Sequence, residues 1–491
     1  MNAFPLSRLC TALLLSSTLL AGCMVGPDYQ KPTAPLSAIF KEAQGWKAAN
    51  PQDELPKGAW WTLYQDPQLD ALVGQVQLNN QNVALYAAQY QQALALVRQS
   101  RAELFPVLTG TGSSTRSETG TGSSSTGSSS GSSAGGVSKE HSASLDLSWE
   151  ADIWGKLRRT NEQDRASAQA SAADLANATL SAQSSLAQNY FQLRLLDQRI
   201  ALYRETIAGY ERYLQIIQNK YDEQISSRAD LATGKTQLQS AQASMLDLQW
   251  QRAQLEHAIA LLIGKPPADF ALSADPAWQY HVPAVPLGVP SRLLERRPDI
   301  AAAERQMAAA NAAVGVATAA YYPDLTLSAS GGYRSSTVSN LFSLPNRFWS
   351  IGPSLTGTIL DFGATRAGVD QARHAYDATV ATYRQTVLTG LGEVEDYLVE
   401  LRTLQPELEA RRNSAQSAEE SAAVSRDQYE AGVIDYLDVA TTQATSLNER
   451  QTLLSLVATQ LVTSVQLQAA LGGSWNPEQP VSMAAGNAGT H

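Results

Sequence analysis

The chain has 491 residues, a formal net charge of −10 and two cysteines, Cys10 and Cys23. This acidity disfavours nucleic acid as a partner, because nucleic acid attracts clusters of lysine and arginine. If the first 22 residues are removed, Cys23 alone remains, which excludes an intramolecular disulfide and a cysteine-rich metal site.

Residues 1–22 form a predicted export signal. Arg8 supplies a positive charge, and the apolar run 9–20 is too short to span a bilayer as a mature helix. The sequence Leu-Ala-Gly-Cys at 20–23 resembles the bacterial lipobox, in which the cysteine is lipidated and becomes the first mature residue. We therefore expect Cys23 to carry N-palmitoyl and S-diacylglycerol groups. An ordinary secreted protein with a chance cysteine is the alternative.

The rest of the chain contains an internal repeat. Asp230 and Asp438 are 208 residues apart, as are Gly264 and Gly472. A Ser/Gly-rich insert at 110–136 falls inside the first copy, so it predicts a hairpin loop rather than an interdomain linker. Each copy predicts the order helix, strand, loop, strand, very long helix, shorter helix.

The repeat divides the chain into six expected segments. They are the signal at 1–22, an N-terminal lipid anchor and equatorial segment at 23–65, the first repeat at 66–264, an equatorial linker at 265–297, the second repeat at 298–472, and an equatorial segment with a disordered tail at 473–491. The expected strands lie near 105–115, 140–153, 323–334 and 348–361, the long helices near 158–220 and 364–430, and the shorter helices near 227–263 and 436–471.

Two long helices dominate this prediction. No proline occurs between 107 and 265, and apolar residues recur every three or four positions over 186–221. A helix over 158–220 would be about 95 Å long at 1.5 Å per residue, a length typical of a fibre, a stalk or a tube. Pro406 interrupts the second long helix and is expected to kink it or mark a bend.

Apolar and polar residues alternate in the predicted strands. In 143–153 the odd positions are apolar and the even ones polar, and 349–355 has a similar pattern. Such strands fit a barrel wall between lipid and lumen, and they fit a half-buried soluble sheet equally well. The lipoprotein signal favours the membrane. Four strands are too few to close a pore, since small barrels need about eight, so the barrel is expected to be shared between subunits.

Four motifs spread over the chain carry a resemblance to a known family. They are Cys-Met-Val-Gly-Pro-Asp-Tyr at 23–29, Trp-Trp-Thr-Leu-Tyr-Gln-Asp-Pro-Gln-Leu at 60–69, Arg-Arg-Pro-Asp-Ile-Ala-Ala-Ala-Glu-Arg at 296–305 with Tyr-Tyr-Pro-Asp-Leu at 321–325, and Tyr-Glu-Ala-Gly-Val-Ile-Asp-Tyr-Leu-Asp at 429–438. Together they resemble the outer-membrane factors of tripartite efflux and type I export, the TolC-like family, and most closely its lipoprotein branch (NodT/OprM-like).

The resemblance implies a fold that is mainly α with a membrane β-barrel. Three identical chains would share one twelve-stranded barrel, with a long periplasmic α-helical tunnel and a mixed equatorial collar. The implied location is the cell outer membrane, lipid-anchored and multi-pass, extending into the periplasm. Met24 rather than Asp follows Cys23, so the usual inner-membrane retention signal is missing.

The implied function is the outer-membrane channel of a tripartite efflux system of the RND type, which passively conducts drugs or other toxic compounds. The implied partners are a periplasmic adaptor (a membrane fusion protein), an inner-membrane RND pump and outer-membrane lipid. The alternatives are a channel of a type I or other export system, and a structural coiled-coil surface lipoprotein without a pore. The cargo is left open.

The resemblance also implies gate residues at the periplasmic mouth. Tyr429 takes the family's tyrosine position, Gly432 the turn glycine and Asp438 an acidic-ring position. Asp435 and Asp230, the first-copy counterpart of Asp438, are further gate candidates. For Asp435, capping of the returning helix is the alternative.

Two departures from the family pattern argue against a salt-bridge lock at the mouth. Ile434 stands where some members place an arginine, and Thr441 stands where some place a second aspartate. No catalytic motif stands out, and the five histidines show no metal-ligand spacing. We therefore expect no enzyme activity, no bound metal and no cofactor beyond the covalent lipid.

Overall fold

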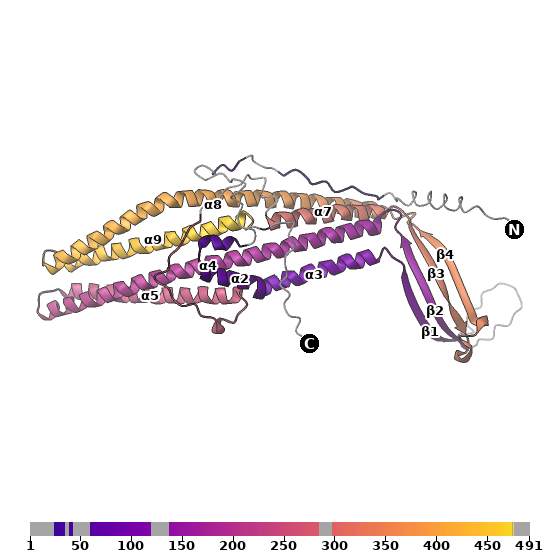
Figure 1. Cartoon of the computed structure of the whole chain (residues 1–491), viewed down its shortest axis with the longest axis horizontal. Coiled ribbons are helices and arrows are strands. Elements are labelled where there is room, and N and C mark those ends of the chain that lie inside the picture. Colours follow the sequence, from indigo (N-terminus) through magenta and orange to yellow (C-terminus); the bar gives the residue numbers. More distant parts are fainter. Residues whose placement is uncertain are drawn as a thin grey trace. The chain divides into compact units, whose positions relative to one another are not determined.

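The computed structural model describes residues 24–34, 39–42, 59–118, 137–283, 297–473 and 475. Its elements in chain order are η1 (Trp60–Tyr64), α2 (Pro67–Asn79), α3 (Gln81–Ala102), β1 (Val107–Glu118), β2 (Val137–Ala151), α4 (Lys156–Asp222), α5 (Arg228–Leu262), η2 (Pro267–Asp269), α7 (Pro298–Ala319), β3 (Asp324–Ser335), η4 (Val338–Asn340), η5 (Leu344–Asn346), β4 (Arg347–Thr356), α8 (Ala364–Glu430) and α9 (Tyr436–Ala470) (Figure 1).

The chain divides into two compact units. The strand unit comprises the described residues of 1–32, 91–169 and 305–381, and the hairpin unit comprises those of 33–90, 170–304 and 382–491. The strand unit holds the sheet and the adjoining helix ends. The hairpin unit holds two antiparallel helical hairpins, α4–α5 and α8–α9.

The sheet of the strand unit is antiparallel, with the order β1-β2-β3-β4 (Figure 1). Its register aligns Leu108 with Leu147, Leu147 with Ala329, and Ala329 with Ile351. Because directly opposite residues point to the same side of a sheet, these four residues form one row of an apolar face.

The two faces of the sheet differ in chemistry. On the apolar face, the Ile351 side chain is 75% exposed in the single chain. On the other face, hydroxyl groups pair across strands, with Oγ–Oγ distances of 2.7 Å for Ser113–Ser142 and 2.8 Å for Ser330–Ser350. A half-buried soluble sheet would cover its apolar face. The uncovered face therefore favours the membrane-wall interpretation of these strands.

The end of β4 differs from the prediction. We expected a strand over 348–361, whereas β4 ends at Thr356. Thr356 is paired with Asp324, and the preceding residue, Pro323, has no N–H group to extend the ladder. The proline that opens β3 thus also determines where β4 stops.

Aspartates at equivalent positions of the two repeats bind the first N–H groups of the two long helices. The Asp152 carboxylate accepts hydrogen bonds from the backbone N–H groups of Leu157 (3.1 Å) and Arg158 (3.0 Å). The Asp361 carboxylate accepts one from the N–H of Thr365 (2.8 Å). Each aspartate satisfies free N–H groups at the start of its helix, and its charge is favourable at that end of the helix dipole.

The residues that follow Cys23 are held against the start of α4. The N–H of Val25 donates to the carbonyl of Trp154 (3.1 Å). Arg159, whose side chain is 1% exposed, donates to the carbonyl of Val25 (3.3 Å) and to the Asp28 carboxylate (2.8 Å). Cys23 itself lies outside the described residues, so its lipidation stays a prediction.

α8 continues through Pro406, where a kink or a bend was expected. The helix runs without a break over 67 residues and includes Pro406 in its interior, although Figure 1 shows it curving toward its C-terminal end. Leu404 and Leu408, on either side of the proline, are buried. Their packing offsets the backbone hydrogen bond that proline cannot make.

A buried ion-pair network fixes the segment after α5 to the hairpin unit. The Asp197 carboxylate, 1% exposed, accepts hydrogen bonds from Arg194 Nη1 (3.0 Å), Arg252 Nε (2.6 Å) and the N–H of Asp275 (3.1 Å). Arg252 also donates to the carbonyl of Leu272 (2.5 Å). The predicted equatorial segment is therefore tied to α4 and α5 by charged groups.

α9 is the one described helix whose length and composition would allow it to cross a membrane. In its most apolar stretch, 44% of the residues are buried inside the protein. Val457, Leu461 and Val465 pack there in the main core of the hairpin unit, together with Trp60 and Tyr190. Core packing accounts for the apolar composition of α9.

Candidate functional site

The turns at the ends of the two hairpins have the same backbone geometry. The N–H of Ile225 donates to the carbonyl of Lys220 (2.8 Å), and the N–H of Val433 donates to the carbonyl of Gln428 (2.9 Å), 208 residues further on. Gly432 has a φ of +76°, in the left-handed region that glycine adopts without strain. The turn requires this conformation, so Gly432 has a local structural role.

The three candidate aspartates have different surroundings. Asp230 forms a capping box with Ser227, because its carboxylate accepts the Ser227 N–H (3.0 Å) and its own N–H donates to Ser227 Oγ (3.1 Å). Partial burial acts to raise the pKa of Asp230, but hydrogen bonds from Ser227 and Ser226 hold it below the usual value. The carboxylate of Asp230 is therefore already engaged in starting α5.

Asp435 and Asp438 occupy the equivalent positions in the second hairpin. Asp435 is the N-cap residue of α9, yet its side chain makes no capping hydrogen bond. Both residues are exposed. Neither carboxylate has an ion-pair or hydrogen-bond partner within the described residues. The second hairpin thus presents two free carboxylates at the place where the first hairpin uses its aspartate as a cap.

Tyr429 packs between the two hairpins rather than at the surface. Its side chain is 6% exposed, and its ring meets that of Tyr436 with centroids 5.8 Å apart. Lys220 Nζ lies 4.1 Å from the centre of the Tyr429 ring, a cation–π contact between the hairpins. Burial raises the pKa of Tyr429, and the nearby charge of Asp230 raises it further. The role of Tyr429 at the mouth stays a prediction.

Two hydrogen bonds of the Gln237 side chain also join the hairpins near their ends. The Tyr436 hydroxyl donates to Gln237 Oε1 (3.0 Å), and Gln237 Nε2 donates to the carbonyl of Ala440 (3.0 Å). Burial and neighbouring tyrosines raise the pKa of Tyr436 to about 12, so its hydroxyl stays protonated at neutral pH. This link was not predicted, although Tyr436 lies within the quoted motif 429–438.

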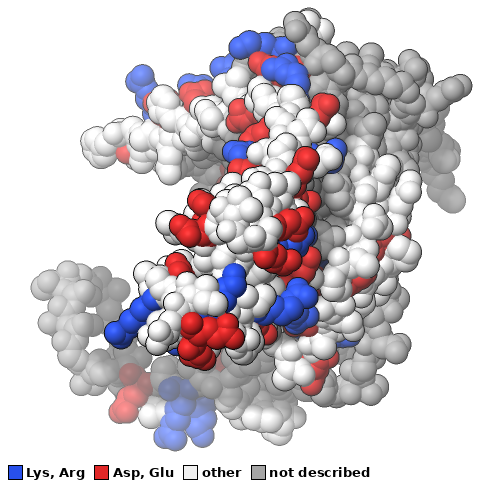
Figure 2. Space-filling model, turned by 90° about the vertical axis from the view of Figure 1, so that its left-hand side faces the viewer, with Lys and Arg blue, Asp and Glu red and all other residues white. Residues whose placement is uncertain are grey.

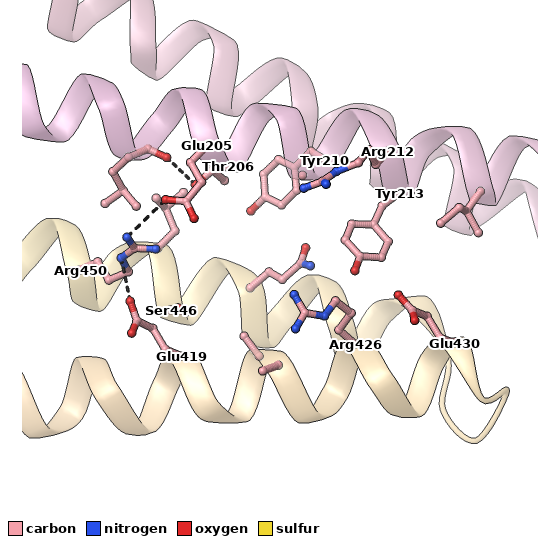
Figure 3. A pocket seen from close by; sticks show the side chains of 17 residues that line it. Glu205, Thr206, Tyr210, Arg212, Tyr213, Glu419, Arg426, Glu430, Ser446 and Arg450 are labelled. Carbon is pink, nitrogen blue, oxygen red and sulfur yellow. Dashed lines mark hydrogen bonds and ion pairs between the residues drawn. The ribbon is translucent and has the colours of Figure 1, made fainter. Parts of the chain in front are cut away.

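A cleft of about 510 Å³ lies between α4, α8 and α9 (Figure 3). Arg450 extends into it and pairs with Glu205 of the first hairpin (3.5 Å) and Glu419 of the second (2.9 Å). Tyr210 and Tyr213 line the cleft from α4. No sequence motif pointed to Arg450, because an arginine on a long polar helix face has no distinguishing pattern.

The two hairpin ends differ in charge, which Figure 2 shows from the end where the turns lie. The segment 211–235 has four acidic and four basic residues, whereas the equivalent segment 419–443 has six acidic residues and one basic residue, Arg426. The acidic residues of the second segment are Glu419, Glu420, Asp427, Glu430, Asp435 and Asp438. The repeat has kept the backbone of the turn but not its electrostatics.

Within the described residues, no group of three or more His, Cys, Asp or Glu side chains could hold a metal ion. Comparison with known proteins shows which family has this arrangement. A family model described as outer membrane efflux protein matches residues 72–265 and 289–473. The chain belongs to this family.

Individual relatives span almost the whole chain. The solved structure of the outer-membrane channel OprN is 28% identical with a TM-score of 0.83, over 92% of this chain and 99% of OprN. The antibiotic efflux pump outer membrane protein ArpC of Pseudomonas putida is 29% identical, over 94% of this chain and 95% of ArpC. The cation efflux system protein CusC of Escherichia coli O6:H1 is 28% identical, over 97% of this chain and 100% of CusC.

Membership of the outer membrane efflux protein family confirms the predicted function and location. The chain is an outer-membrane channel of a tripartite efflux system that extends into the periplasm, and it is a transport component, not an enzyme. The fold class is also confirmed, with helices predominating and each of three chains contributing a small sheet to a membrane barrel. Channels of this family work with an adaptor and an inner-membrane pump.

Proposed function

We propose that the hairpin ends form the periplasmic gate of this efflux channel and that Asp435 and Asp438 line its mouth. The observation that carries this proposal is the contrast between the copies, since Asp230 is occupied in a capping box while Asp435 and Asp438 are exposed and unpaired within the described residues. Threefold repetition turns each free aspartate into an acidic ring, and such rings favour cations.

A few specific links between the hairpins add to the apolar cluster that joins the same ends and help to close the gate. They are the Tyr436–Gln237 pair, the Lys220–Tyr429 contact and the Arg450–Glu205 ion pair. A hydrogen bond contributes about 0.5–1.5 kcal/mol, and an exposed ion pair about 0–1 kcal/mol. An adaptor that binds the separated hairpins more tightly would shift the population toward an open mouth.

Removal of the free carboxylates tests the gate. In lipid bilayers, Asp435→Ala and Asp438→Ala are expected to lower cation preference or to raise single-channel conductance, because each removes three charges from the mouth. Asp377→Ala, which removes an exposed aspartate of α8 in the strand unit, is the matched control and should behave like the wild type. Unchanged conductance and selectivity in both tip variants would remove these residues from the gate.

The cargo and the pump form a separate proposal. We infer that an inner-membrane RND pump delivers drugs or other toxic compounds to the channel through a periplasmic adaptor. ArpC and CusC, named for antibiotic and cation efflux, match this chain about equally well, which supports a conduit that leaves cargo choice to its partners. Gene deletion with susceptibility profiling, in parallel with pump deletions, tests this. Sensitivity that matches no pump deletion would contradict it.

We also propose that Cys23 carries the lipid as an auxiliary tether. Cys23→Ala, exported with a substitute cleavable signal, is expected to retain some efflux activity, because the barrel already spans the membrane. Acyl chains add about 0.8 kcal/mol per buried methylene, which strengthens attachment without providing the pore. The measurements are toxicant susceptibility and the amount of inserted trimer. Complete loss of inserted trimer would show that the lipid does more than tether.

A further inference from the structure

The outer end of the sheet carries basic side chains on its apolar face. Arg116 of β1 lies directly opposite Lys139 of β2. Along each strand, an even number of positions separates the cation from the apolar residue, Leu108 on β1 and Leu147 on β2. The cations therefore point to the same side of the sheet as these leucines. Arg347 of β4 is likewise an even number of positions from Ile351 and points to the same side. All three cations are exposed.

These cations lie at the end of the sheet that faces the exterior. The end of β1 at Glu118, the start of β2 at Val137 and the β3–β4 connection at 335–347 lie at the opposite end of the strands from the adjoining helix ends of α3, α4, α7 and α8 (Figure 1). Since the helices lead into the periplasm, this end of the strands faces outward. Aromatic residues share this end, with the rings of Tyr333 and Phe342 5.5 Å apart. Aromatic girdles mark the membrane interface of such barrels, so the cations lie near headgroup level.

The three cations form no ion pair within the part of the chain that the structure describes. Within the described residues, no carboxylate lies within ion-pair distance of Arg116, Lys139 or Arg347. Glu140 pairs with Arg334 (3.4 Å), and the register places both on the opposite face of the sheet. The only acidic residue that the register places with the cations at this end is Glu118.

A neighbouring chain of the trimer adds only its own Glu118 to this face through this part of its sequence. Residues 119–136 contain no Asp or Glu, and neither does the stretch 325–360, which includes β4 and the connection before it. Like charges directly opposite each other destabilise a strand pair. Each chain thus carries three cations and one carboxylate on this face at this end, and the excess positive charge favours an anion from outside the protein.

We propose that this rim binds the phosphate groups of the phosphorylated glycolipid of the outer leaflet, lipid A. Its phosphates lie at headgroup level, and its acyl chains lie against the apolar face of the sheet. Guanidinium groups bind phosphate through two parallel hydrogen bonds. A lysine beside an arginine adds a second positive charge to the same phosphate. Three chains give the barrel three equivalent rims.

Native mass spectrometry of the purified trimer with added lipid A tests the proposal. The triple variant Arg116→Gln, Lys139→Gln, Arg347→Gln is expected to bind bisphosphorylated lipid A at least tenfold more weakly than the wild type. Lipid A without phosphates should bind the wild type as weakly as it binds the variant. The control variant Arg366→Gln, Arg373→Gln removes exposed charges from α8 and should bind lipid A like the wild type.

Three results would overturn the proposal. They are equal lipid A affinity in the triple variant and the wild type, equal affinity of the wild type for phosphorylated and dephosphorylated lipid A, and full competition by inorganic phosphate, which would indicate a free-anion site. If the triple variant forms no trimer, measurements on the wild type and on a lysine variant still test the proposal. The lipid A binding of the wild type must weaken with rising salt, and the variant Arg116→Lys, Arg347→Lys, which keeps the charges but loses the paired hydrogen bonds, must bind phosphorylated lipid A more tightly than dephosphorylated lipid A.

Discussion

Replacement of Ile351 by arginine is expected to prevent stable insertion of the trimer into the outer membrane. Ile351 lies at the middle of β4 and points from the apolar face of the sheet, where it is uncovered. An arginine on the lipid face near the membrane midplane costs about 2–4 kcal/mol, and the trimer would carry three. The amount of folded trimer in outer-membrane fractions measures the effect.

The adjacent residue offers a matched control. Ser350 occupies the same depth on β4 but points to the hydroxylated face, where its Oγ meets that of Ser330. Ser350→Arg is expected to insert and to form trimers, with a change in conductance because the new charge faces the lumen. Equal loss of trimer in the two variants, or normal insertion of Ile351→Arg, would contradict the assignment of the apolar face to lipid.

The second large effect is expected at Asp197. Asp197→Ala leaves Arg194 and Arg252 without their shared carboxylate and releases the N–H of Asp275. Loss of one partner from a buried ion pair destabilises a protein by about 3–5 kcal/mol. We expect a lower unfolding midpoint by far-UV circular dichroism, and earlier proteolysis in the segment after α5.

An exposed aspartate provides the comparison for this stability measurement. Asp377→Ala removes a carboxylate that is 71% exposed on α8, and such surface changes usually stay within about 0.5 kcal/mol. If Asp197→Ala unfolds at the same midpoint as Asp377→Ala, the network does not hold the segment. A double variant that also replaces Arg194 by methionine should recover part of the lost stability, because Asp197 is the carboxylate that pairs with Arg194 within the described residues and the unpaired charge is then removed.

The sequence could predict the helices and strands because their signals are local. The alternation of apolar and polar residues predicted the strands. Prolines marked the starts of two of them, since β1 begins after Pro106 and β3 after Pro323. The end of β4 was placed too late because it depends on Pro323 across the sheet. Pro406 was expected to kink α8 or to mark a bend, and the helix continues through it. The effect of a proline inside a helix depends on packing that the local sequence does not contain.

The contacts near the proposed gate were harder to predict because they join residues about 200 positions apart. The family resemblance offered Tyr429 and Asp438 as gate candidates, yet it could not show that Tyr429 packs against Lys220. One local signal was available and was missed. Ser227 followed three residues later by Asp230 is a capping-box pattern, and it would have separated Asp230 from the free aspartates of the second hairpin.

The sheet has a consequence for the assembly of the channel. Within the described residues, β1 and β4 each have one neighbouring strand, so a single chain has two open edges beside its uncovered apolar face. Open edges and apolar faces promote aggregation. A newly exported chain therefore has a short time in which to meet two others, and the yield of channels should rise steeply with chain supply and fall when transport across the periplasm slows. The fold thus makes the rate of delivery, as well as stability, a condition for a working pore.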